Sequence, residues 1–227
     1  RHCVVASTWA FEAQGPGSIP GGGAIRLHTV SSDLHIIVLA AGEGTRMKSV
    51  TPKVLHSICG RTLLGHVISA VSDLKPKDVA VVVGAGRELV EEHIGQIAPK
   101  ARTIFQERRG GTGHATQLAL AAGIPNGTVL ILAGDTPMLT SDSLSQLLEV
   151  HHNGKFGASV LTAEHPDPTG YGRIIRSDDG ELLRIVEERD ADEDQKMIFE
   201  INSGVYVFDG KLLAGAIGKL SDSNSQG

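Results

Sequence analysis

The sequence predicts an α/β fold in which helices flank a Rossmann-like, mainly parallel sheet, with a β-rich lobe toward the C-terminal end. Two observations predict the sheet. From Leu34 onward, short apolar runs alternate with segments of helical periodicity, and strand–helix–strand units at this spacing form right-handed crossovers between parallel strands. A third observation predicts the lobe, because after Ala158 the chain changes to short β-rich segments separated by charged loops.

The expected elements follow one another in a regular order. Residues 34–40 form an apolar run typical of a strand buried on both faces, and apolar residues from Leu63 to Leu74 recur at helical spacing. A helix is expected to open at Ser141, with this serine as its N-cap. The other expected strands are 79–83, 103–105, 129–132, 172–176, 182–187 and 201–208, and the other expected helices are 88–97 and 112–122.

Composition excludes several classes of function. The chain of 227 residues has 21 basic and 26 acidic side chains and a net charge of −5, which gives no general attraction to nucleic acid or to an anionic membrane. No apolar run is long enough to span a bilayer. Two cysteines, Cys3 and Cys59, form no disulfide framework and are consistent with a reducing cytoplasm, so a cytoplasmic protein is expected.

The first 33 residues differ from the rest of the chain. They contain two glycine- and proline-rich stretches, at 15–17 and 20–23, and show no sustained periodicity. Their apolar start is too short for a signal peptide. We expect residues 1–33 to be a disordered leader or a non-native extension, and residues 34–227 to form the folded domain.

A glycine-rich turn directly after the first strand is the most informative segment. It reads Leu-Ala-Ala-Gly-Glu-Gly-Thr-Arg-Met over residues 39–47, and Thr-Pro-Lys follows at 51–53. Glycines at the carboxyl end of a strand let backbone N–H groups approach phosphate oxygens, and Arg46 and Lys53 supply positive charge. A dinucleotide fingerprint would need glycine where Met47 stands, and no P-loop triplet follows Gly42. The turn therefore indicates a different kind of phosphate site.

Other polar residues also stand where strands are expected to end. Asp135 follows the strand at 129–132, and one carboxylate with substrate phosphates is a common way to hold Mg²⁺. Gln106 carries the donor and the acceptor needed to bind a pyrimidine edge, although a surface glutamine fits the position equally well. The ten histidines show no metal-ligand spacing, and His114 is expected at a helix start near the site.

Together these segments resemble the nucleotide-diphospho-sugar pyrophosphorylases. Gly-Gly-Thr-Gly-His-Ala at 110–115, Ala-Gly-Asp-Thr-Pro at 133–137, Thr-Gly-Tyr-Gly-Arg-Ile at 169–174, Ile-Val-Glu at 185–187 and Glu-Ile-Asn-Ser-Gly at 200–204 follow in order. This ordered set is similar to the uridyltransferase domain of the bacterial bifunctional GlmU family, from about Leu34 to Gly227. The resemblance implies the nucleotide-diphospho-sugar transferase fold, with the β-rich lobe binding sugar.

The resemblance also implies roles for individual residues. Uracil would be held by Ala41, Gly42, Gln106 and Gly111, whereas Arg46 and Lys53 would neutralise the phosphates as catalytic residues. Asp135 would ligate Mg²⁺, the implied cofactor. Sugar and ribose hydroxyls would be held by Thr112, Gly172, Glu187 and Asn202. The remaining residues of the implied substrate site are Leu39, Ala40, Ala133 and Gly134.

The implied reaction joins UTP and N-acetylglucosamine 1-phosphate, for bacterial cell-wall precursor synthesis. One alternative is a nucleotidyltransferase for another sugar phosphate, and a second is a nucleotide-sugar-binding domain without turnover. Relative to the family pattern, the end of the first domain is expected to be missing, together with an Asn that would be a second metal ligand. Relative to the same pattern, the acetyltransferase domain, through which family members form homotrimers, is also expected to be missing, so acetyl transfer is not expected.

Overall fold

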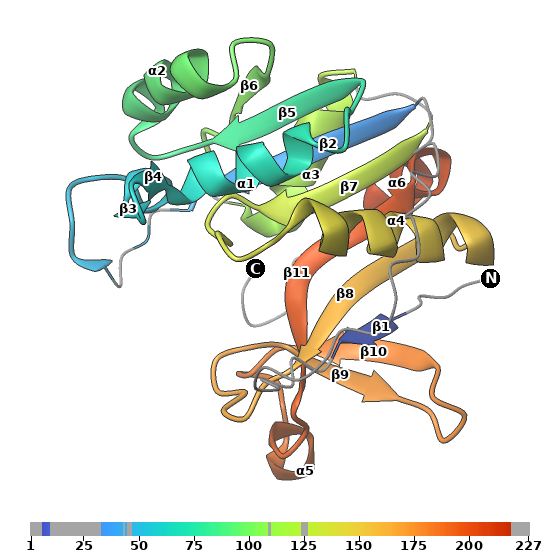
Figure 1. The fold of residues 1–227 in the computed structure, drawn as a ribbon. Helices are drawn as coiled ribbons and strands as arrows, with labels where there is room; N and C mark the ends of the chain where they lie inside the picture. The colour runs from blue at the N-terminus through green and yellow to red at the C-terminus, as the bar shows by residue number, and fades with distance from the viewer. Residues whose placement is uncertain are drawn as a thin grey trace, which may run out of the picture.

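The computed structural model describes residues 33–42, 44, 47–108, 110–123 and 127–218, together with the backbone of residues 6–9. A single twisted sheet runs through this part of the chain in the order β1-β8-β11-β7-β2-β5-β6 (Figure 1). Its central strands are β2 (Leu34–Ala40), β5 (Asp78–Val83), β6 (Arg102–Phe105) and β7 (Thr128–Ala133). These four strands pair in parallel, as predicted from the alternation of strands and helices.

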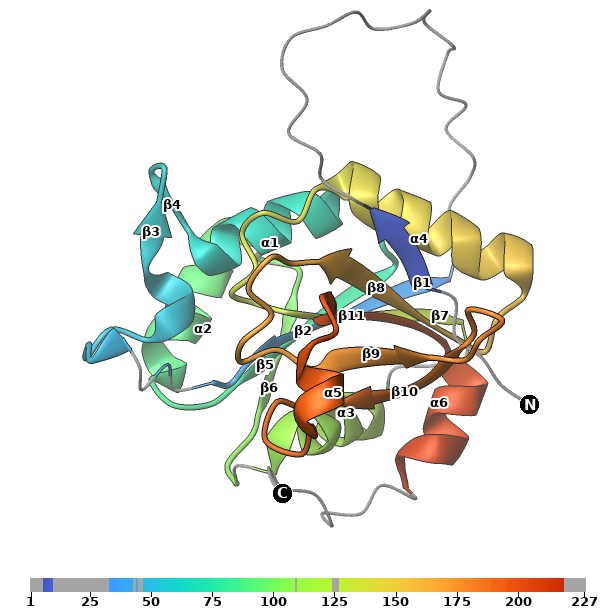
Figure 2. The same cartoon turned by 90° about the horizontal axis from the view of Figure 1, so that it is seen from below.

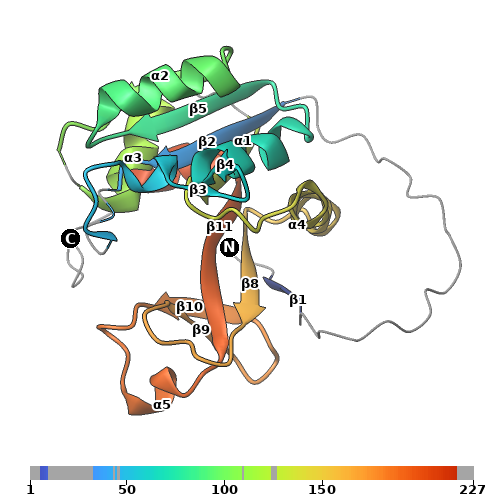
Figure 3. The same ribbon diagram turned by 60° about the vertical axis from the view of Figure 1, so that its left-hand side comes forward.

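Helices cover both faces of the sheet. Packed on one face are α1 (Leu63–Ser72), α2 (Arg87–Ile97) and α4 (Ser141–Gly154), whereas α3 (Gly111–Ala121) and α6 (Gly210–Ile217) lie on the other (Figures 1 and 3). Strand β2 shows why both faces are apolar: Ile36 and Val38 pack into the first core, and Ile37 packs into the second. The sheet therefore lies between two hydrophobic layers.

The β-rich lobe extends from the same sheet. Strands β8 (Ala158–Glu164) and β11 (Glu200–Asp209) continue beyond the central strands, where β9 (Arg173–Arg176), β10 (Leu182–Val186) and helix α5 (Glu193–Lys196) join them (Figures 2 and 3). Strand β11 pairs antiparallel with β7, β8 and β9. One strand therefore connects the parallel sheet to the lobe.

Smaller elements complete the described part of the chain. A short 3₁₀ helix η2 (Lys53–Leu55) leads into the two-stranded ladder β3 (Ser57–Ile58) and β4 (Arg61–Thr62). Strand β1 (Ala6–Trp9) pairs in parallel with β8. Residues 1–5 and 10–32 of the expected leader lie outside the described residues, so the assignment of residues 1–33 stays a prediction.

The structure corrects one predicted helix cap. Ser141 is the first residue of α4, and Thr140 is the N-cap: its backbone is extended, and its Oγ1 accepts a hydrogen bond from the Ser143 N–H at 3.2 Å. Seven elements of the described residues were also missed, namely β1, η2, β3, β4, β8, α5 and α6. Within the described residues, no helix combines the length and the apolar character that crossing a bilayer requires.

Helix α4 carries a buried histidine that ties it to the lobe strand β8. The His151 side chain is 4% exposed, and its Nδ1 lies 2.9 Å from Ser159 Oγ. Burial lowers the pKa of His151 to about 4, and the neighbouring His152 acts in the same direction. His151 is therefore neutral in the folded protein near pH 7.

Candidate functional site

The predicted glycine turn lies where strands β2 and β7 end together. Leu39 pairs with Ala133, and the Gly134 N–H donates to the Leu39 carbonyl at 2.9 Å. A Cβ at Gly134 would lie 3.3 Å from the Cβ of Ala40, whereas a Cβ at Gly42 would meet no atom within 4 Å. The turn is thus tightly packed toward β7 and open beside Gly42, as a loop that receives a ligand must be.

Two groups of opposite charge meet beside this turn. Lys53 Nζ forms an ion pair with Asp135 Oδ2, and both side chains are partly exposed. A Cβ at Gly44 would lie 2.5 Å from the Lys53 Cβ, so the turn packs directly against the lysine side chain. The sequence predicted Lys53 near the turn and Asp135 at a strand end, and the structure brings the two residues into contact.

The donor set at Asp135 fits a magnesium ion. Among the described residues, no three His, Cys, Asp or Glu side chains cluster as an all-protein metal site. Mg²⁺ commonly uses one or two carboxylates and completes its shell with substrate phosphates and water. Asp135 is a partly exposed carboxylate next to a lysine suited to phosphate, which is the chemistry that such a shared site requires.

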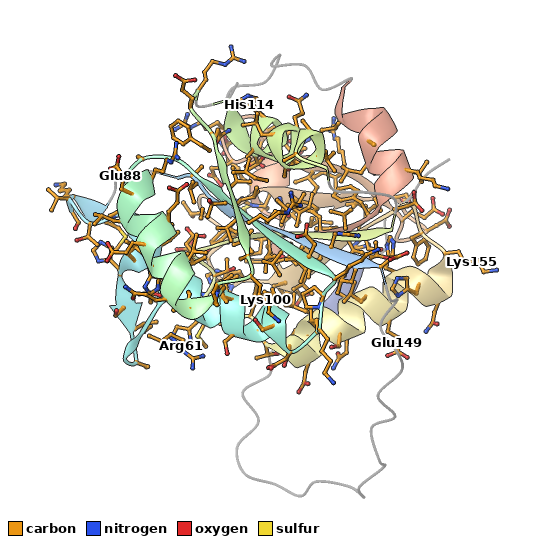
Figure 4. All side chains as sticks on the ribbon, turned by 90° about the horizontal axis from the view of Figure 1, so that it is seen from above. Arg61, Glu88, Lys100, His114, Glu149 and Lys155 are labelled. Carbon is orange, nitrogen blue, oxygen red and sulfur yellow. The ribbon has the colours of Figure 1, made fainter. Side chains whose placement is uncertain are left out.

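A second polar group forms where β6 leads into α3. Gln106 is 9% exposed, and its backbone N–H donates to the Val83 carbonyl at 2.8 Å. Its side-chain Nε2 donates to the Gly111 carbonyl at 3.1 Å and lies 3.0 Å from Nδ1 of His114, which Figure 4 labels on α3. The predicted pair Gln106 and Gly111 is therefore in direct contact.

A third group lies in the lobe. A Cβ at Gly172 would lie 3.2 Å from Glu187 Oε1 and 3.5 Å from the Asn202 Cβ, so these three predicted residues are neighbours. The Asn202 amide donates to Tyr206 Oη at 2.6 Å and accepts from the Gly204 N–H at 3.0 Å. Burial raises the pKa of Tyr206, and the nearby Glu187 carboxylate raises it further. Tyr206 therefore stays protonated and holds the Asn202 amide in one orientation.

A buried arginine fixes the loop that carries Gly172. The Arg173 side chain is 2% exposed; its Nη1 donates to the Tyr171 carbonyl and its Nη2 donates to Glu188 at 2.7 Å. The same Glu188 oxygen accepts the Gly170 N–H at 3.1 Å. The arginine holds the pKa of the Glu188 carboxyl below its usual range. Residues 170–172 are thus pinned from two sides.

Strand register places the lobe group on the same side of the sheet as Asp135. Strand β11 runs antiparallel to β7, with Tyr206 opposite Ile131 and Asp209 opposite Thr128. Asn202 precedes this paired stretch and so lies beyond the carboxyl end of β7, which is also where Asp135 follows Ala133. The strand ends, the glycine turn and the lobe group therefore lie along one edge of the sheet, at the carboxyl ends of the parallel strands, which is where open α/β sheets generally bind ligands.

The predicted site residues have three outcomes. Most of them lie in three groups along this edge, and the residues within each group are close neighbours. Thr112 is exposed in the first turn of α3. Arg46 lies outside the described residues, so its role stays a prediction. Sequence reasoning missed Tyr206, Arg173 and Glu188 as supports of the lobe group. Arg173 and Glu188 did stand next to the singled-out Gly172 and Glu187, a sequence signal that could have suggested them.

Comparison with known proteins identifies the family to which the chain is similar. The model of the MobA-like NTP transferase domain family matches residues 36–203. The bifunctional protein GlmU of Streptomyces avermitilis is 52% identical over 195 residues, which cover 85% of this chain and 40% of that protein. GlmU of Thermobifida fusca is 50% identical over 197 residues, covering 85% and 41%. The chain thus spans about two fifths of these relatives, and the predicted resemblance to GlmU is confirmed over that length.

A solved structure supports the fold alone. A chain from Bacillus anthracis, named as a candidate glucose-1-phosphate thymidylyltransferase, superposes with a TM-score of 0.68 at 21% identity. The match covers 83% of this chain and 79% of that one. It confirms the predicted α/β class with a mostly parallel sheet. From the family match over residues 36–203 and the site at the carboxyl ends of the parallel strands, the chain belongs to the MobA-like NTP transferase domain family.

Proposed function

We propose that this chain is a nucleotidyltransferase that transfers a uridylyl group from UTP to N-acetyl-α-D-glucosamine 1-phosphate. The products are UDP-N-acetylglucosamine, a cell-wall precursor in bacteria, and pyrophosphate. The observation that carries the proposal is the Lys53–Asp135 ion pair beside the open glycine turn. It offers a cation for phosphate and a carboxylate for a divalent ion at one strand edge, which is what transfer between phosphates requires.

The resemblance to the GlmU family supplies the choice of substrates. The proteins of S. avermitilis and T. fusca are both named as the bifunctional protein GlmU. This chain aligns with about two fifths of each protein and is about 50% identical to it over that length. The predicted uracil contacts, Gln106 and Gly111, touch each other at one side of the edge. The predicted sugar contacts, Gly172, Glu187 and Asn202, gather at the other. Two separate polar groups flanking a phosphate site suit a reaction between a nucleotide and a sugar phosphate.

The proposed chemistry is a single in-line displacement. An oxygen of the sugar 1-phosphate attacks the α-phosphorus of UTP, the bond from that phosphorus to the β-phosphate oxygen breaks, and pyrophosphate leaves with the electron pair. Lys53 exchanges its contact with Asp135 for the phosphates and stabilises their charge, together with Arg46. Asp135 is the residue that would hold Mg²⁺, which neutralises phosphate charge when bound.

The lobe contributes alignment in this proposal. The Asn202 amide has one N–H beyond its bond to Tyr206, and the Asn202 side chain and the Glu187 carboxylate both lie beside Gly172. An amide donor and a carboxylate acceptor suit sugar hydroxyls. Holding the sugar there would fix its phosphate against the α-phosphorus, and such alignment accounts for much of the rate of a two-substrate reaction.

The rival assignments differ in measurable ways. Pyrophosphate release is measured with UTP, CTP, dTTP and GTP, each against N-acetylglucosamine 1-phosphate and glucose 1-phosphate. We expect release with UTP and the N-acetylated sugar phosphate. Release with another pair would replace the substrates and keep the mechanism, whereas tight UTP binding without release from any pair would favour a domain that only binds. A cytoplasmic location, a role in cell shape, and trimers of the longer relatives remain part of the proposal.

A further inference from the structure

We propose that His114 and Gly110 contribute to the choice between uracil and cytosine by fixing, together with the Gly111 carbonyl, the orientation of the Gln106 amide. This inference rests on the proposed function, because it assigns the nucleotide's base to the Gln106 group. In this proposal His114 is a positioning residue that acts through Gln106. The Gln106 amide makes two hydrogen bonds inside the protein.

The Gly111 carbonyl decides which end of the amide faces it. A backbone carbonyl only accepts, so the Gln106 atom 3.1 Å from it must be the NH₂ group. The second proton of that NH₂ then points to His114 Nδ1, 3.0 Å away, which must be the unprotonated nitrogen of the ring. A flipped amide would set two carbonyl oxygens against each other. Both donors of Gln106 are therefore used inside the protein.

This arrangement leaves one polar atom of Gln106 for a ligand. Oε1 has no hydrogen-bond partner among the described residues, and it can only accept. Gly111, whose carbonyl accepts from this amide, is also the first residue of α3. This helix begins without a side-chain cap, so its first N–H groups are available as donors near Gln106. The protein thus presents an acceptor beside donors.

Uracil and cytosine differ in the edge that would meet this pattern. Uracil has an N3–H donor beside the O4 acceptor, which complements an acceptor beside donors. Cytosine has the reverse, an N3 acceptor beside the N4 amino donor, so both contacts would be repulsive or unmade. A site whose buried polar groups pair only with the correct substrate rejects the wrong one strongly, because those groups are left unsatisfied.

Gly110 gives the imidazole room to reach Gln106. A Cβ at position 110 would lie 2.7 Å from both Cβ and Cγ of His114 and 2.9 Å from its Nδ1. The Gly110 φ of −112° is open to any residue, so an alanine there would act by displacing the ring and not by straining the backbone. The absence of a side chain at Gly110 therefore lets the His114 ring lie within hydrogen-bonding distance of Gln106.

The test compares the dissociation constants of UTP and CTP, by calorimetry with Mg²⁺, in matched variants. We expect the native protein to prefer UTP by roughly a hundredfold or more. His114→Leu removes the acceptor at similar volume and should narrow this preference about 3- to 10-fold, the value of one hydrogen bond. His114→Asn places an amide oxygen near the Nδ1 position and should restore it. Gln117→Leu removes a hydrogen bond made by the same helix, from Gln117 to the Ile217 carbonyl, and should leave the ratio of the UTP and CTP dissociation constants unchanged.

Gly110→Ala is the second route if His114→Leu does not fold, and it should also narrow the preference. A folded His114→Leu or Gly110→Ala protein with the native UTP-to-CTP ratio would overturn the inference, as would a native protein that binds both nucleotides equally. Pyrophosphate release is measured in parallel. Pyrophosphate release from UTP, with a UTP-to-CTP ratio that the variants leave unchanged, would support the proposed function and overturn the role of His114. Selective UTP binding that the variants weaken, without pyrophosphate release, would support the role of His114 and overturn the proposed function.

Discussion

The pinned loop at residues 170–172 gives a prediction that separates positioning from stability. Replacing Arg173 by methionine removes its bonds to the Tyr171 carbonyl and to Glu188 while filling similar apolar volume. Hydrogen bonds to charged groups each contribute about 1.5–3 kcal/mol. Glu188 keeps 30% of its side chain exposed and can rehydrate, so the net loss of unfolding free energy should be about 2–3 kcal/mol.

The functional consequence follows from the loop's freedom. Ordering a backbone residue costs about 1–2 kcal/mol of conformational entropy. In the Arg173 variant this cost would reduce the free energy of sugar-phosphate binding, because the loop would become ordered only on binding. The KM for N-acetylglucosamine 1-phosphate should therefore rise about tenfold, with the KM for UTP nearly unchanged. Steady-state pyrophosphate release, with each substrate varied in turn, measures both values.

Arg176 provides the matched control on the same strand. It pairs with Glu200 at 2.5 Å and bonds the Gly180 carbonyl at 2.8 Å, with no bond to residues 170–172. Arg176→Met should lower stability by a similar amount in urea denaturation and leave the sugar-phosphate KM near the native value. Equal KM values in the Arg173 and Arg176 variants would refute the positioning argument, whatever their stabilities.

Three further predictions concern charge, acidity and close packing. Lys53→Met should lower the turnover number by roughly two to three powers of ten in the same assay, as loss of a preorganised cation does; turnover within a few-fold of native would remove Lys53 from the mechanism. The pKa of His151 is about 4 in the folded protein, against 6.5 for the free side chain. The contribution of neutral His151 to the free energy of unfolding is therefore complete above pH 6.5 and is lost as pH falls toward 4, by up to about 3 kcal/mol. Urea denaturation from pH 7 to 4.5 should show a steeper loss for the native protein than for His151→Leu, and parallel curves would contradict this. Gly86→Ala should reduce turnover at least fivefold, because a Cβ at this φ of 69° would overlap the Pro52 ring next to Lys53. Gly180→Ala, with a φ of 80° and open space, should lose only stability, and equal turnover in the two alanine variants would be the contrary result.

Much of the fold could be predicted because its signals are local. The buried parallel strands are continuous apolar runs, and β2 was expected at 34–40, the residues it occupies. The two missed helices lack such signals. Helix α5 has four residues, and α6 contains two glycines and is started by Asp209, whose carboxylate accepts from the N–H groups of Lys211 and Leu212.

The candidate site was predictable as a set of residue types, but its contacts were not. Asp135 and Lys53 are far apart in sequence, and their meeting depends on how β2 and β7 align. Asn202 reaches the same edge only through the antiparallel register of β11. The amide orientation of Gln106 depends on a carbonyl and an imidazole that a motif cannot place. Side-chain partners set by tertiary register carry no periodic signal.

The central claim is that Lys53, Asp135 and the glycine turn form a phosphate-transfer site for UTP. The most direct test is Mg²⁺-dependent pyrophosphate release from UTP and N-acetylglucosamine 1-phosphate, with native protein and Asp135→Asn side by side. The account predicts release by the native protein that stops on chelation of the metal and falls at least a hundredfold in the variant. Undiminished release by Asp135→Asn, with the same dependence on Mg²⁺, would contradict it.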